Sequence, residues 1–169
     1  MSFDDEVIIS YHGEEVWKYK LNDLYNIGIS LENANFISTN GLPKYFSDFT
    51  FFNFENFEKI LYKSSYIIKI GEFSFSKNGL FLKEDEDEIF ATSAYHGTNI
   101  YILNKNVETF FLFHFIKNEL ARHMIEKNKF DSYTYALTLK KEYMERDYTA
   151  MEDEEGYWSH MIEDYKTGL

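Results

Sequence analysis

The chain has 169 residues, and its 17 Lys and Arg against 29 Asp and Glu give a formal net charge of −12. This length predicts one domain, and a 44% hydrophobic fraction with 17 Phe, 14 Tyr and 2 Trp excludes a disordered chain. The sequence has no cysteine, which excludes disulfides, cysteine-based zinc sites and thiol nucleophiles.

No segment approaches the length of apolar sequence that a membrane-spanning helix needs, so we expect no membrane insertion. Residues 1–6 lack the basic and apolar regions of a signal peptide, and we therefore expect a cytoplasmic protein. Neither a linker nor an internal repeat divides the chain, so we expect a single domain over residues 1–169.

The first part of the chain predicts two short strands and a helix. Residues 7–11 have a strand pattern, and residues 16–21 could be their hairpin partner. Ser30 is a suitable N-cap for a helix over residues 31–39, and Gly41 is suited to end it.

The middle of the chain predicts an antiparallel meander of short strands. Asn78-Gly79 is typical of a tight hairpin turn, and an acidic run separates the next two strands. The apolar residues over 66–70 are nearly continuous, which predicts burial on both faces of the sheet. The expected strands are residues 49–54, 66–70, 80–82, 89–92 and 100–103.

The last third of the chain predicts helices. Asn106 can cap a long helix that begins at Val107, whose broad apolar side near its start is typical of a helix lying on a sheet. Further helices are expected over residues 133–145 and 154–165, the last closed by Gly168. Strands followed by helices predict the α+β fold class.

The acidic charge opposes direct binding to nucleic acid and favours a basic protein partner. The acids concentrate in residues 84–88 and in residues 147–164, and no Lys or Arg lies between Asp147 and Tyr165. These segments are either solvated surface or an electronegative docking face. The residues that would form the docking face are Glu84, Asp85, Glu86, Asp87, Glu88, Glu152, Asp153, Glu154 and Glu155.

The sequence contains no recognised catalytic or nucleotide-binding motif. His114 and His123 are half a helical turn out of phase, so they cannot share a small ligand. Glu119 and His123 face the same way and could either ligate a metal or form a surface pair. His96 lies in a predicted loop, where it could act as a general base. We expect neither metal nor cofactor, and an enzyme that uses His96 or His123 is the least favoured of three hypotheses. The acidic run 84–88 lacks the pattern of a calcium loop.

Several short motifs in this order resemble the SUKH superfamily. They are the turn Asn40-Gly41-Leu42-Pro43, the aromatic strand 49–54, the strand 66–72, the Asn78-Gly79 hairpin, and residues 100–104 leading into a Phe-rich helix. Residues 151–164 are similar to the acidic, Trp-containing closing helix of the branch that includes bacterial immunity proteins. The resemblance spans about residues 30–165.

The resemblance implies a twisted, mostly antiparallel sheet flanked by helices, no catalytic activity and a protein-binding role. Members of the immunity branch are cytoplasmic proteins that bind and neutralise toxin domains, often nucleases, of polymorphic toxin systems. The acidic segments would then steer a basic toxin domain, and Trp158 would be either an interface anchor or buried against the sheet. The alternative is a regulatory adaptor of the same superfamily, like the yeast glucan-synthesis regulators, that binds a housekeeping partner. We expect a monomer by default.

Overall fold

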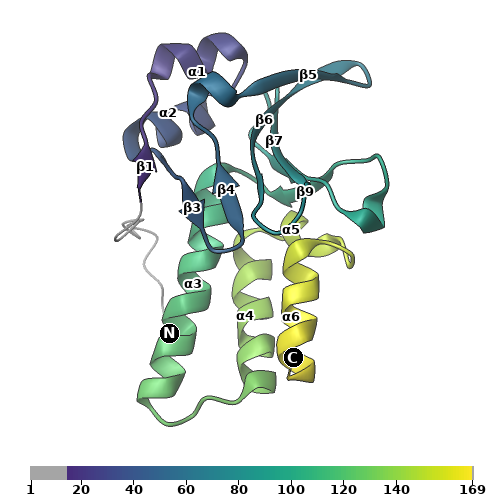
Figure 1. Cartoon of the computed structure of the whole chain (residues 1–169). Helices are drawn as coiled ribbons and strands as arrows, with labels where there is room; N and C mark the ends of the chain where they lie inside the picture. Colours follow the sequence, from purple (N-terminus) through teal and green to yellow (C-terminus); the bar gives the residue numbers. More distant parts are fainter. Residues whose placement is uncertain (1–14, 169) are drawn as a thin grey trace.

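An antiparallel sheet occupies the middle of the chain, and three long helices follow it (Figure 1). The computed structural model describes residues 15–168, so the strand expected over residues 7–11 lies outside the described part. The α+β class predicted from the order of sequence patterns is confirmed. Within residues 15–168, no helix combines the length and the apolar character that crossing a bilayer requires.

The main sheet is an antiparallel meander with one branch. Its strand order is β3-β4-β6-β7-β8-β9, and β6 is long enough to pair with β5 along its first half and with β4 along its second. The strands are β3 (Tyr45–Phe46), β4 (Phe49–Phe51), β5 (Glu58–Tyr62), β6 (Ser65–Phe73), β7 (Gly79–Lys83), β8 (Ile89–Ala91) and β9 (Tyr101–Asn104).

Alternation along the strands separates two apolar clusters. Ile68 and Leu82 point to the main core, whereas Ile67, Phe81 and Phe90 form a smaller cluster on the opposite face. Burial of both Ile67 and Ile68 confirms the prediction that this part of β6 is covered on both faces.

The strand expected over residues 16–21 is shorter than predicted. β1 (Val16–Trp17) pairs with β2 (Leu42–Pro43), and the next residues form α1 (Leu21–Ile27) instead of continuing as a strand. The backbone turns because the Lys20 carbonyl accepts hydrogen bonds from the amides of Asp23 and Leu24, and Leu24 is buried.

The second helix, α2 (Leu31–Asn40), begins and ends where the sequence predicts. The Ser30 hydroxyl accepts a hydrogen bond from the Asn33 amide, and Gly41 follows the helix with a φ of 79°. A side chain at position 41 would also collide with Val16, because a Cβ there would lie 2.4 Å from the Val16 side chain.

Three helices form a layer against one end of the sheet, with α4 between α3 and α6 (Figure 1). As predicted, Asn106 caps α3 by accepting a hydrogen bond from the Thr109 amide at 2.7 Å. The last helix begins at Tyr157, not at residue 154, because the chain first makes the short helix α5. The bounds are α3 (Val107–Glu126), α4 (Ser132–Arg146), α5 (Thr149–Glu152) and α6 (Tyr157–Thr167), with 3-10 turns η1 (Phe54–Asn56) and η2 (Ala94–His96).

Trp158 lies in the centre of the contact between the sheet and the helices. Its side chain is fully buried, and its indole Nε1 donates hydrogen bonds to the Leu103 carbonyl (3.1 Å) and to Asn104 Oδ1 (3.0 Å). Phe113 and Tyr143 pack against it with ring centroids 5.2 and 5.3 Å away. The expectation that Trp158 anchors a partner is therefore wrong, and the alternative of burial against the sheet is confirmed.

His114 of α3 is a buried polar residue within this aromatic core. Rings of Phe46, Phe49, Phe110 and Trp158 lie around it, and its Nε2 has no hydrogen-bond partner among residues 15–168. Burial holds the pKa of His114 well below its ordinary value, and the neighbouring Lys117 lowers it further. The imidazole is therefore neutral in the folded protein.

This neutral histidine makes the fold sensitive to acid. Below the ordinary histidine pKa of 6.5, the unfolded chain takes up a proton that the folded protein excludes, so the free energy of unfolding falls as the pH is lowered. When the pH falls from about 7.5 to about 5.5, we expect the free energy of unfolding of the wild type to fall by roughly 1 kcal/mol more than that of His114→Leu. Urea unfolding followed by circular dichroism at the two pH values measures this difference, and an equal loss in both proteins would contradict the account.

Candidate functional site

A pocket of about 520 Å³ opens where two hairpin turns of the sheet meet helix α6. Segments distant in the sequence contribute its walls: the β3–β4 and β6–β7 hairpins, the chain after β8, and one face of α6. Its lining residues are Ser47, Asp48, Phe73, Asn78, Thr92, Ser93, Tyr95, Tyr101, Lys117, Glu155, Tyr157, His160, Met161, Asp164 and Tyr165.

Asp48 enters the pocket from a two-residue turn. Phe46 pairs with Phe49, so Ser47 and Asp48 alone connect β3 to β4, and Ser47 has the left-handed φ of 52°. Tyr157 donates its hydroxyl hydrogen bond to Asp48 Oδ2 at 2.6 Å. Burial, followed by the contact with Asp48, raises the pKa of the Tyr157 phenol, so Tyr157 remains a donor and holds the carboxylate in place.

Aromatic rings form much of the pocket wall. Tyr95 stacks on His160 with ring centroids 4.8 Å apart and an angle of 24° between the planes. Tyr101 and Tyr165 also line the pocket, and burial raises the pKa of both phenols. The phenols of Tyr101 and Tyr165 therefore stay neutral.

Carboxylates outnumber cations in the pocket. Asp48, Glu155 and Asp164 line it together with one lysine, Lys117. Burial lowers the pKa of Lys117, although the nearby Asp48 charge opposes that shift. The pocket therefore carries a net negative charge at neutral pH.

Two of the segments that line the pocket carry strongly exposed aromatic side chains. Phe75, at the tip of the β6–β7 hairpin between the lining residues Phe73 and Asn78, is 89% exposed, and Tyr95 is 69% exposed. These are the highest values for any large apolar side chain in residues 15–168. Exposed aromatics beside a pocket are typical of a surface that binds another molecule.

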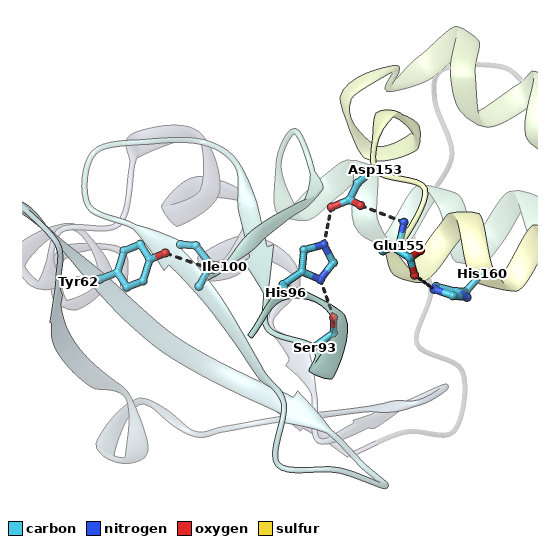
Figure 2. A network of polar contacts seen from close by, with 7 residues as sticks. All are labelled: Tyr62, Ser93, His96, Ile100, Asp153, Glu155 and His160. Atoms are coloured by element: carbon cyan, nitrogen blue, oxygen red, sulfur yellow. Dashed lines mark hydrogen bonds and ion pairs between the residues drawn. The ribbon is translucent and has the colours of Figure 1, made fainter. Parts of the chain in front are cut away.

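Beside the pocket, a chain of polar contacts ties η2 to the loop before α6 (Figure 2). Ser93 Oγ lies 2.6 Å from His96 Nδ1, and His96 Nε2 lies 2.6 Å from Asp153 Oδ2. Asp153 also accepts a hydrogen bond from the Glu155 amide at 3.0 Å, and the Glu155 carboxylate lies 3.0 Å from His160 Nε2. The network thus fixes both Ser93 and Glu155, two residues of the pocket wall.

The same network has the order of groups that activates a serine nucleophile. When the His96 proton is on Nε2 and is donated to Asp153, Nδ1 accepts a hydrogen bond from the Ser93 hydroxyl. His96 also stacks on Tyr101, with centroids 4.3 Å apart. These contacts explain equally well a structural role, in which His96 anchors η2.

The acidic run of residues 84–88 is the turn between β7 and β8, and it does not line this pocket. Glu84 pairs with Lys59, and Glu86 pairs with Lys83, each at 2.5 Å. Asp85 and Asp87 are exposed. Local lysines thus compensate two of the five charges, which weakens this run as a docking face.

The second acidic segment divides into exposed and structural residues. Glu152, Glu154 and Glu155 are exposed at the corner between α5 and α6, and Asp153 belongs to the network described above. Asp147 is buried and accepts hydrogen bonds from Asn104 Nδ2 and the Lys105 amide, so it stabilises the fold instead of facing a partner. The structure does not bring the two acidic segments together in one pocket.

The Glu119 carboxylate accepts hydrogen bonds from Arg122, which lies three residues further along α3. In the described part of the chain, no group of three or more His, Asp or Glu side chains has the arrangement of a metal site.

Sequence reasoning missed Asp48 as a member of the site and Phe75 as an exposed residue of the adjoining hairpin. Both lie at hairpin tips, and the turn signals could have placed them in loops, but the contact of those loops with α6 depends on tertiary packing. The sequence matches no protein-family model, and no match was found among curated proteins or solved structures. The resemblance to the SUKH superfamily therefore stays a prediction.

Replacing His96 distinguishes a structural from a chemical role of the network. If it is structural, His96→Ala loses two hydrogen bonds to a partly buried ring, and we expect the free energy of unfolding to fall by about 1–3 kcal/mol. Amide hydrogen exchange should also accelerate over residues 93–99. The control His123→Ala, at the end of α3, should change stability by less than about 0.5 kcal/mol. Unchanged stability and exchange in His96→Ala would contradict the structural role and leave His96 a candidate general base.

Proposed function

We propose that this protein is a non-enzymatic binding protein that recognises a basic protein domain through the pocket beside α6. The observation that carries the proposal is that Phe75 and Tyr95, the two most exposed aromatic side chains in residues 15–168, lie on two of the segments that line a pocket with a surplus of carboxylates. Aromatic side chains supply most of the binding energy in many protein interfaces, and charge complementarity selects the partner.

The whole-molecule charge supports the same kind of partner. A net charge of −12 attracts a basic protein and repels nucleic acid. A protein that binds nucleic acid needs a basic surface to hold phosphates, and an acidic protein can cover that surface. A nuclease domain is therefore a suitable partner.

The resemblance to the SUKH superfamily supplies the biological setting of the proposal. We infer that the protein is a cytoplasmic immunity protein, which neutralises a cognate toxin domain by covering its active site. In the alternative, a regulatory adaptor, the same surface would bind a housekeeping protein. The two differ in whether the partner is toxic when the protein is absent.

The test uses the C-terminal segment encoded by the gene immediately upstream as the partner. We expect tight binding, and co-expression should restore growth to cells that produce this segment. Phe75→Ser should raise the dissociation constant about tenfold or more, because it removes a strongly exposed aromatic side chain from a hairpin that lines the pocket. Isothermal titration calorimetry measures the change.

The control variant is Leu61→Ser, which removes another exposed apolar side chain from strand β5, away from the pocket. Its dissociation constant should stay within about threefold of the wild type. Equal losses in both variants would contradict the assigned surface. Binding without any toxicity of the partner would favour the adaptor.

A further inference from the structure

The pocket beside α6 has features that select one chemical group. The face of α6 that lines it carries Tyr157, His160, Met161, Asp164 and Tyr165, which recur at steps of three and four residues and so share one side of the helix. This face offers aromatic rings and one carboxylate. Asp48, from the β3–β4 turn, adds a second carboxylate beside Tyr157.

The charges favour a cationic guest. Three carboxylates and one lysine line the pocket, and the Asp48 carboxylate is already oriented by a hydrogen bond of 2.6 Å from the Tyr157 hydroxyl. The Tyr157 bond uses one position on Oδ2, which leaves further acceptor positions on the carboxylate. Glu155 and Asp164 are exposed and accessible from solvent.

The ring surfaces favour a flat cation. The stacked pair of Tyr95 and His160 lies at the pocket wall, and Tyr95 is strongly exposed. A cation over the face of such a ring gains a favourable interaction, and a planar guanidinium can stack on the ring while its N–H groups bond to carboxylates. An ammonium group offers no comparable plane.

We propose that this pocket binds the guanidinium group of an arginine side chain that projects from the basic partner. The inference rests on the proposed function and deepens it, since it assigns the pocket to one side chain of the partner. A peptide-borne arginine fits better than free arginine, because the free amino acid brings two further charged groups, an α-ammonium and an α-carboxylate, whose desolvation beside the pocket opposes binding.

The test needs no partner protein. N-acetyl-arginine methylamide serves as the probe, and the neutral citrulline analogue of the same shape serves as its control. In two-dimensional NMR of the labelled full chain, we expect the arginine probe to shift amide signals of the pocket residues. The dissociation constant of the citrulline analogue should be at least about tenfold higher, because this analogue lacks the positive charge. Free L-arginine should bind more weakly than the blocked probe.

Two double variants locate the binding. Glu155→Gln with Asp164→Asn removes two exposed carboxylates of the pocket and should weaken probe binding about tenfold. Asp85→Asn with Asp87→Asn removes the same charge from the distant β7–β8 turn and should leave probe binding within about twofold.

Several results would overturn the inference. They are equal binding of the citrulline analogue, equal losses in both double variants, and tighter binding of free arginine than of the blocked probe. Failure of the probe, with binding and neutralisation of the upstream segment intact, would remove the arginine assignment alone. Failure of the upstream segment with success of the probe would leave the pocket assigned and overturn the proposed partner.

Discussion

The burial of one indole N–H sets the position of the last helix. Trp158 Nε1 cannot reach water, so it is satisfied by the Leu103 carbonyl and by Asn104 Oδ1, while Asn104 Nδ2 is held by Asp147. A buried donor without a partner would cost a large part of the stability of a domain of this size. The orientation of α6 against β9 is therefore fixed by a polar network inside an apolar core.

The pocket depends on that orientation. Tyr157 precedes Trp158 on α6, so fixing the indole also directs the Tyr157 hydroxyl toward Asp48 at the tip of the β3–β4 hairpin. The Ser74 amide donates to the Asp48 carbonyl at 2.7 Å, which ties the β6–β7 hairpin to the same point. Two hairpin tips, one of which carries the exposed Phe75, thus meet α6 where the carboxylates of the pocket lie, and this junction is the surface that we propose for the partner.

Local signals in the sequence predicted the elements, and tertiary contacts decided the site. Side-chain caps such as Ser30 and Asn106 act within four residues, so the starts of α2 and α3 could be read directly. Strand β5 was missed because most of its residues are exposed and it lacks an apolar alternation. The sequence left Trp158 as either an anchor or a buried residue and counted Asp147 in an acidic segment. Both are buried, because Trp158 finds its partners only when α6 packs on β9, and Asp147 only when the end of α4 meets Asn104 and Lys105.

The central claim is that the junction of the two hairpins with η2 and α6 contacts the basic partner. Hydrogen–deuterium exchange of the protein, alone and bound to the segment encoded upstream, tests it most directly. The account predicts that binding slows exchange over residues 74–78, 93–97 and 155–165, and leaves residues 84–88 unchanged. Slower exchange confined to residues 84–88 would contradict it and would return the docking face to the acidic turn.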